Sequence, residues 1–231
     1  MLRLNLLGEL EVWRDEKRLA LPPSRKTRAL LGFLAASGRS HRRERLCSMF
    51  WEVPDDPRGS LRWSMSRLRA IVDEPHAQRI LANRESVGFE PQGADIDLLA
   101  LRAASGKGFD QLETETLTEL AGAFRGEFLE GLELPAQHEF QAWCLAERED
   151  LRQQQIQLLT TLAHRLAEAG EPAIGPWRQL TQIDPYNEAA RLELLRALIA
   201  AGREQEAERQ YEAAERQFRE LGGDTAARFT R

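Results

Sequence analysis

Long apolar runs are absent from this sequence of 231 residues, and so is an N-terminal segment in which positive charges precede an apolar stretch. A membrane-spanning helix needs roughly 18 or more mostly apolar residues, and a secretion signal needs the charged and apolar parts together. Cysteine is scarce as well, because Cys47 and Cys144 stand singly and far apart. We therefore expect a cytoplasmic protein with no membrane partner and no disulfide bond.

The residue patterns that enzymes and metal sites need are also missing. The four histidines, at positions 41, 76, 138 and 164, are scattered, and no glycine-rich phosphate-binding loop is present. The segment HEFQA, which starts at residue 138, lacks the second histidine of a zinc-binding helix. The sequence predicts no catalytic residues, no cofactor and no metal site.

The charge is unevenly divided along the chain, although the formal net charge is only −5. Residues 1–94 hold 17 Lys and Arg against 12 Asp and Glu, a net +5, whereas residues 95–231 hold 15 against 25, a net −10. A basic half joined to an acidic half indicates an anionic partner for the first and a different role for the second.

The basic half begins with short alternating runs that predict small antiparallel strands, LRLNLLG, ELEVWRD and KRLALP. Ser24 and Gly38 are a start and a stop signal for a helix over about 25–37. A short helix follows in RRERLCSMFW, and we expect Pro54 and Pro57 to end it. A basic helix comes next, and then a hairpin around Asn83 and Arg84. This order predicts a winged helix-turn-helix, whose third helix enters the DNA major groove.

The third helix, within residues 58–74, carries four arginines. Its core stripe is Leu61, Met65, Leu68 and Val72, at helical spacing. The candidate DNA-binding residues lie elsewhere on this helix and at the hairpin, and they are Arg58, Arg62, Trp63, Ser66, Arg67, Arg69 and Arg84. Arginine pairs with guanine O6 and N7, and serine donates or accepts hydrogen bonds. Two alternatives stay open, namely that this face is only solvated and that Trp63 packs beneath the hairpin instead of contacting a thymine methyl or a sugar.

The acidic half is almost continuously helical in pattern from 140 to 220, with breaks at Gly170 to Pro176, at Asp184-Pro185 and at Gly202. Residues 34 positions apart correspond, as in the pairs Ala173 and Ala207, Trp177 and Tyr211, and Leu180 and Ala214. This is the tetratricopeptide period, with small and aromatic residues on the second helix of each unit. Gly175-Pro176 is expected to interrupt that second helix in the first unit. A helix over about 139–168 completes the array, and a simple helical bundle is the alternative.

Several segments occur in the order in which they occur in a known family: LLGELEV, RLCSMFWE, SLRWSMSRLRAIV, DIDLLAL, FRGEFLEGL, AWCLAERED, IDPYNEAARLELLRALIAAGR and FRELGGDTAARF. Over nearly its whole length the chain resembles the Streptomyces antibiotic regulatory protein family. The resemblance implies a mainly α fold with a small β component, in which a response-regulator-type winged helix-turn-helix over 1–94 precedes a tetratricopeptide-like bacterial transcriptional activator domain over 95–231.

The same resemblance implies an activator that binds duplex DNA at direct repeats near promoters, as a homodimer there, and that contacts RNA polymerase. It places Arg62, Ser66, Arg67 and Arg69 on the recognition helix and Arg84 on the wing. The chain departs from the family where Arg42 replaces a small capping hydroxyl, which leaves Ser40 or solvent as the cap, and where the wing lacks a glycine-rich tip. Larger members continue beyond this domain, so the sequence is either a short member or a fragment. The competing hypothesis is a protein-interaction scaffold that does not bind DNA.

Overall fold

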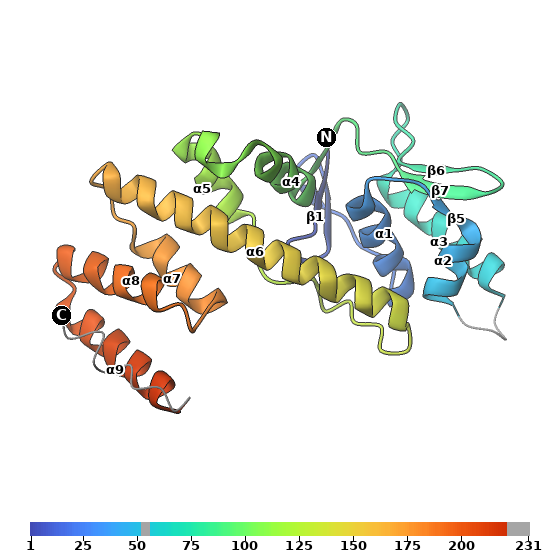
Figure 1. Cartoon of the computed structure of the whole chain (residues 1–231). Helices are drawn as coiled ribbons and strands as arrows, with labels where there is room; N and C mark the ends of the chain where they lie inside the picture. The colour runs from blue at the N-terminus through green and yellow to red at the C-terminus, as the bar shows by residue number, and fades with distance from the viewer. Residues whose placement is uncertain (52–55, 221–231) are drawn as a thin grey trace. The chain divides into compact units, whose positions relative to one another are not determined.

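The computed structural model of the chain describes residues 1–51 and 56–220. The chain is mainly helical with small sheets, which confirms the predicted fold class (Figure 1). It divides into two compact units, namely Met1–Gly106 with Gly122–Leu151, and Lys107–Ala121 with Arg152–Arg231. The domain boundary after residue 94, which was placed by charge and by family resemblance, stays a prediction.

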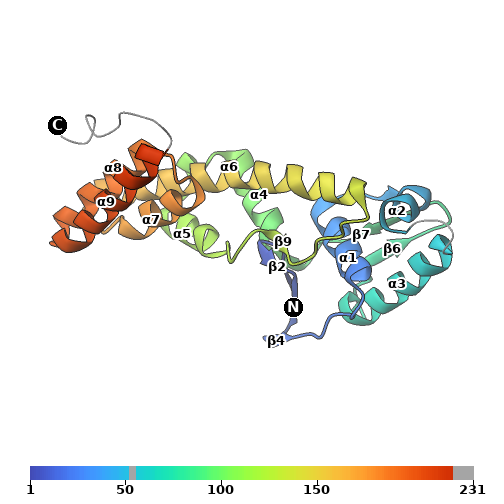
Figure 2. The same ribbon diagram turned by 90° about the horizontal axis from the view of Figure 1, so that it is seen from below.

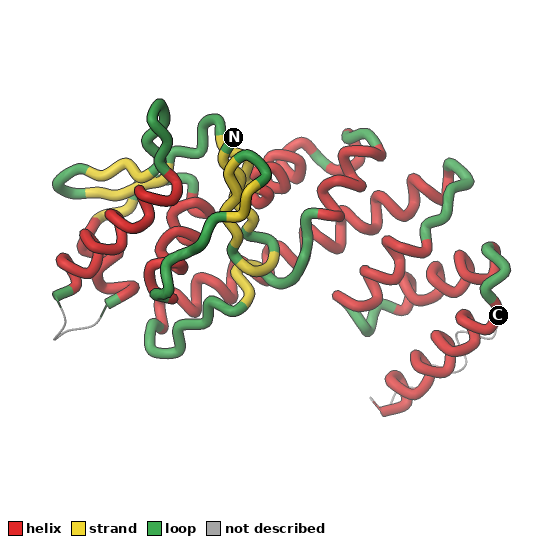
Figure 3. Tube along the Cα trace, turned by 180° about the vertical axis from the view of Figure 1, so that it is seen from behind, coloured by secondary structure: helices red, strands yellow, loops and turns green. Residues whose placement is uncertain are grey.

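The first unit opens with the strands expected at the start of the chain. Three of them and the later strand β8 form a four-stranded sheet in the order β4-β3-β1-β8, with the bounds Lys17–Arg18, Glu11–Arg14, Leu2–Asn5 and Ala94–Ile96. The strands of the chain are the yellow segments in Figure 3. Strand β1 pairs antiparallel with β3 and parallel with β8. Asp15 and Glu16 make the turn between β3 and β4 with φ angles of 46° and 68°, the left-handed conformation of a tight hairpin turn.

Three helices follow, namely α1 (Arg25–Ser37), α2 (Arg43–Phe50) and α3 (Pro57–Val72) (Figure 2). The start and stop of α1 are as predicted, because the Ser24 side chain accepts from the Thr27 N–H and Gly38 is left-handed with a φ of 63°. The expected role of Pro57 was wrong, since this residue begins α3 and the capping Trp51 already ends α2. Proline is favoured in a first helical turn, where its missing N–H has no partner to lose. Pro54 lies outside the described residues.

The predicted hairpin is confirmed, and a third strand joins it. Strands β6 (Ile80–Ala82) and β7 (Ser86–Phe89) pair antiparallel, and β7 also pairs with β5 (His41–Arg42). The β5 strand pairs with β7 next to the hairpin turn and leads directly into α2, so the turn end of the hairpin is tied to the start of that helix.

Helix α4 (Asp97–Lys107) begins at a buried carboxylate. Asp97 accepts hydrogen bonds from the backbone N–H groups of Leu6 (2.8 Å), Leu7 (3.0 Å) and Leu98 (2.7 Å), and its Oδ2 lies 3.3 Å from Nη2 of Arg125. Burial raises the pKa of this carboxyl, while the backbone donors and Arg125 favour its charged form. The carboxylate therefore joins the end of β1 to the start of α4.

An aromatic cluster holds the first part of α6 (His138–Glu168) against the helices of the same unit. The ring of Trp143 lies 4.8 Å from that of Phe33 in α1, and the ring of Phe140 lies 5.2 Å from that of Phe50 in α2. Aromatic rings at such separations are favourable beyond the area that they bury. The first part of α6 is thus a component of the core beneath α1 and α2.

A two-stranded parallel pair also belongs to this unit. Strand β2 (Gly8–Glu9) pairs with β9 (Phe128–Glu130), which begins 120 positions later in the chain. The Leu129 side chain beside it occupies the space that a side chain at Gly32 of α1 needs, since a Cβ built there lies 2.8 Å from the Leu129 methyl groups. Glycine at position 32 therefore lets β9 approach α1.

The second unit is helical. It contains most of α5 (Thr114–Gly122), the remainder of α6, then α7 (Ile174–Ile183), α8 (Glu188–Ala200) and α9 (Glu204–Glu220). The corresponding pairs at the 34-residue spacing are largely inward, with Ala173, Ala207, Trp177, Leu180 and Ala214 all buried. The expected interruption at Gly175-Pro176 was wrong, because these residues form the first turn of α7.

No helix within residues 1–51 and 56–220 is long and apolar enough to cross a membrane. Cys47 and Cys144 are both buried, and neither forms a disulfide bond. Burial raises the pKa of the Cys144 thiol to about 12.

Candidate nucleic-acid interface

The interface is built around α3, and its local sequence explains where the helix begins and ends. Asp56 precedes it, and Oδ1 of its carboxylate accepts from the Gly59 N–H at 2.8 Å. Pro57 supplies a fixed backbone in the first turn. The helix ends where the Asp73 N–H reaches the carbonyl of Arg69.

The inward side of α3 is the predicted apolar stripe. Leu61, Met65, Leu68 and Val72 are each at most 4% exposed. One polar contact lies among them, a 2.9 Å hydrogen bond between the buried hydroxyls of Ser64 and Thr27 in α1. A buried hydroxyl pair that satisfies itself fixes the register of two helices, because sliding either helix leaves both groups unpaired. The stripe therefore determines which side chains point outward.

Two arginines fix the C-terminal end of α3. Nη2 of Arg14, in β3, donates to the carbonyls of Ile71 (2.8 Å) and Asp73 (3.0 Å). Arg69 donates from Nε (3.3 Å) and Nη2 (3.2 Å) to the Ile80 carbonyl at the start of β6. Positive charge near a helix C-terminus is favourable, because the last carbonyls lack partners within the helix. Arg69 is therefore a link between α3 and the hairpin.

The outward side of α3 is basic and exposed. The Arg62 guanidinium lies 3.8 Å from Asp56, and the Arg58 guanidinium lies 3.9 Å from Glu44 of α2. Ser66 is exposed, and so is Trp63, at 47% of its surface. The Arg67 guanidinium carbon lies 5.3 Å from the centre of the Trp63 ring. Exposed ion pairs of this kind are weak, so these arginines are available to an anionic ligand.

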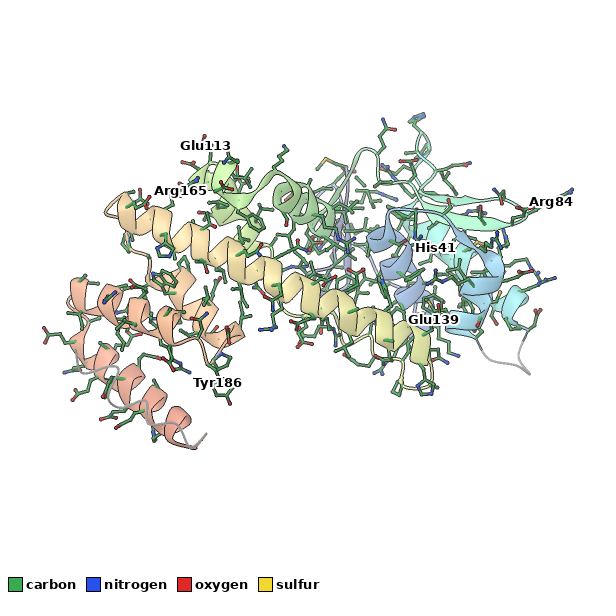
Figure 4. All side chains as sticks on the ribbon, in the orientation of Figure 1. His41, Arg84, Glu113, Glu139, Arg165 and Tyr186 are labelled. Atoms are coloured by element: carbon green, nitrogen blue, oxygen red, sulfur yellow. The ribbon has the colours of Figure 1, made fainter. Side chains whose placement is uncertain are left out.

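The hairpin tip is tight although it has no glycine. The Asn83 side-chain oxygen accepts from the backbone N–H groups of Glu85 and Ser86, both at 2.8 Å. Arg84 stands at this tip and points away from the strands (Figure 4). An asparagine-stabilised turn thus takes the place of the glycine-rich tip that the family pattern has.

The start of α2 explains how the chain manages without a capping hydroxyl. Arg42 occupies the cap position and makes no side-chain capping bond. The Arg43 N–H instead donates to the Glu85 carbonyl at 2.8 Å, and Arg43 Nε donates to the Asn83 carbonyl at 2.8 Å. The hairpin turn therefore caps α2, and Arg43 holds the turn in place.

These three elements enclose a groove of about 820 Å³. Its lining residues are Arg42, Arg43, Glu44, Arg58, Leu61, Arg62, Asn83, Arg84 and Glu85. Five arginines thus face one groove together with two glutamates. The sequence predicted Arg58, Arg62 and Arg84 as DNA-binding residues, whereas Arg42 and Arg43 join them only in the structure, although the basic run HRRER was a signal for them.

His41 lies in β5, beside the hairpin, and is 5% exposed. Its Nε2 is 2.8 Å from the Ser37 hydroxyl, and its ring is 4.6 Å from the Phe33 ring. Burial lowers the pKa of His41 to about 4, and the charges of Arg39 and Arg45 contribute in the same direction. The imidazole is therefore neutral near pH 7 and belongs to the core that supports the hairpin.

Within the described residues, no group of three or more His, Cys, Asp or Glu side chains is arranged to hold a metal ion. The groove presents hydrogen-bond donors and positive charge, which suit the binding of an anion.

A three-helix core with a hairpin beside its third helix, followed by paired helices, defines a winged helix-turn-helix protein with a helical array. Residues 98–231 match the model of the bacterial transcriptional activator domain. The chain belongs to this family of transcriptional activators, which confirms the resemblance seen in the sequence and the expectation that the protein is not an enzyme.

Two relatives extend over the winged helix as well. Regulatory protein AfsR of Streptomyces coelicolor is 28% identical over 220 residues, which are 89% of this chain and 21% of that protein. The structure of Mycobacterium tuberculosis EmbR, in complex with a low-affinity phosphopeptide, superposes with a TM-score of 0.59 at 21% identity and covers 94% of this chain and 59% of EmbR. The chain thus spans about a fifth of the first relative and under two thirds of the second.

Proposed function

We propose that this protein binds duplex DNA sequence-specifically through α3 and the β6-β7 hairpin and activates transcription from nearby promoters, in the cytoplasm. The observation that supports this most directly is the groove into which Arg42, Arg43, Arg58, Arg62 and Arg84 converge in a chain of net charge −5. An acidic protein gains nothing in solubility from such a cluster, whereas DNA phosphates bind clustered arginines strongly.

In this proposal Arg62 and Arg67 have a different role from the other arginines of the interface. With α3 in the major groove, Arg62 and Arg67 face base edges and Ser66 contacts a base or a phosphate. Arg42, Arg58 and Arg84 lie to the side, at the groove and the hairpin tip, where DNA phosphates run. Arg69 keeps the hairpin aligned with α3 through the Ile80 carbonyl.

The mode of activation is proposed from the family. The protein binds direct repeats as a homodimer and contacts RNA polymerase through its helical array, where the 34-residue repeat favours binding to a protein segment. The excess of acidic residues in 95–231 keeps that half away from DNA phosphates.

A salt titration of the whole chain tests DNA binding. Affinity for duplex DNA, measured by fluorescence anisotropy between about 50 and 200 mM salt, should fall steeply, because each neutralised phosphate contributes about 0.9 to the log–log slope. Arg58→Ala and Arg84→Ala should each lower the slope by about one and weaken binding evenly across sequences. Arg196→Ala, which removes an exposed arginine paired with Glu193 in the acidic half, is the matched control and should change neither. A wild-type slope near zero, or no binding at low salt, would favour the scaffold hypothesis.

A further inference from the structure

The exposed arginines of α3 differ in what holds each guanidinium. Arg58 and Arg62 face carboxylates, and Arg69 donates to a carbonyl. Arg67 has no carboxylate within 4.0 Å and no hydrogen bond among the described residues, and its guanidinium carbon instead lies 5.3 Å from the centre of the Trp63 ring.

Trp63 is placed where a large apolar side chain gains little from burial. It is 47% exposed, and the spacing of four positions from Trp63 to Arg67 sets both side chains on one side of the helix. A second arginine–tryptophan pair, Arg3 and Trp13, shows the contrast, because there the indole Nε1 also donates to Glu11 at 3.1 Å and the ring is partly buried in the sheet. Trp63 makes no hydrogen bond in the described structure, so its contact with Arg67 is the specific interaction that it offers.

Stacking and base recognition use different parts of a guanidinium. In a cation–π contact the ring attracts the guanidinium through its flat face, whereas the N–H groups that pair with guanine O6 and N7 project in the plane of the group. A nearby carboxylate competes with a base for that in-plane edge, whereas an aromatic partner leaves the edge free. Stacking also restricts a long flexible side chain before binding, which lowers the entropy that is lost when the base contact forms.

We propose that Trp63 is a positioning residue for Arg67, which it holds with the N–H edge free to read a guanine in the major groove. This inference rests on the proposed DNA-binding function and adds to it which arginine carries base preference and why. Arg62, whose charge is partly compensated by Asp56, contributes less to that preference.

The test starts with the wild-type chain of 231 residues and a pool of random duplex DNA. The preferred site is selected from the pool, and its affinity is then measured with every single-base change. Arg67→Ala should relax the preference at one G·C pair by about 5- to 150-fold. Trp63→Leu, which keeps an apolar side chain of good helix propensity but no aromatic face, should relax the preference at the same pair by about two- to fivefold. Trp63→Phe should retain most of the preference. In the double variant, Trp63→Leu should add nothing to the effect of Arg67→Ala.

Three results would overturn the inference. They are a Trp63→Leu effect spread evenly over the site, an effect at a different base pair, and effects of the two substitutions that multiply in the double variant. Thermal melting of each variant separates these results from loss of folding, since both side chains are exposed and melting should hardly change. Failure of the proposed function itself is seen in the wild type, which would then select no sequence, whereas failure of this inference leaves wild-type selection intact.

Discussion

Acidification should weaken the fold through His41 before it protonates most carboxylates. The folded pKa of His41 is about 4, against 6.5 in the unfolded chain. At a pH between these two pKa values, His41 is protonated in the unfolded state but not in the folded state. The free energy of unfolding therefore falls as the pH is lowered. The stability is complete above pH 6.5, is lost progressively below it and levels off once the folded histidine is also protonated.

The size of the effect follows from the two pKa values. Proton linkage gives a loss of about 2 kcal/mol between pH 7 and pH 5, and about 3 kcal/mol once both states are protonated. The folded pKa is low because a charged imidazole at this position is kept away from water, packs against the Phe33 ring and lies near the positive charges of Arg39 and Arg45. Glutamates such as Glu11 and Glu133, whose pKa values are lowered by their partners, act below this range.

Urea unfolding of the wild type and of His41→Gln, at intervals from pH 8 to pH 5, measures the effect. The variant should be less stable at pH 8, where both states of His41 are neutral, but its stability should fall by about 2 kcal/mol less on going to pH 5. A nuclear magnetic resonance titration of the His41 ring protons provides an independent value. Parallel pH dependences for the two proteins, or a measured pKa near 6.5, would refute the reasoning.

Two further changes test the support of the interface. Leu68→Ala deletes a fully buried side chain of α3 and should lower the free energy of unfolding, measured by thermal melting, by about 2–5 kcal/mol. Ser66→Ala, on the exposed face of the same helix, should change that free energy by no more than about 0.5 kcal/mol. Equal effects would show that α3 does not pack as described. Asp97→Ala leaves three backbone N–H groups without their acceptor and should cost about 3 kcal/mol or more by urea unfolding, whereas Asp95→Ala, on an exposed carboxylate two residues earlier, is expected to be neutral. A mild Asp97→Ala would mean that water replaces the carboxylate.

Local signals predicted the parts of the fold that local chemistry determines. Ser24, Gly38 and the stripe from Leu61 to Val72 each act within one or two helical turns, so α1 and the inward face of α3 follow from the sequence. Pro57 was misread because a proline stops a preceding helix and starts a following one with equal ease, and only the capping bond of Asp56 to the Gly59 N–H decides between the two.

Contacts between residues far apart in the chain could not be predicted, because they leave no local pattern in the sequence. The bond from the Arg43 N–H to the Glu85 carbonyl and the pairing of β2 with β9 join segments whose separation no local period records. The groove was half predicted for the same reason. Arg58, Arg62 and Arg84 came from the recognition helix and the wing, whereas Arg42 and Arg43 enter it because α2 is capped by a turn some 40 residues later.

The close approach of Gly32 and Leu129 predicts that the residues at these two positions vary together among homologues. A Cβ at position 32 lies 2.8 Å from the Leu129 methyl groups, closer than real contacts allow, so with a larger residue at 32 the Leu129 side chain must shift, and a smaller residue at 129 removes the clash. Homologues with alanine or serine at the first position should therefore have valine or alanine at the second. Substitutions at these two sites, 97 positions apart in the chain, should therefore covary among homologues.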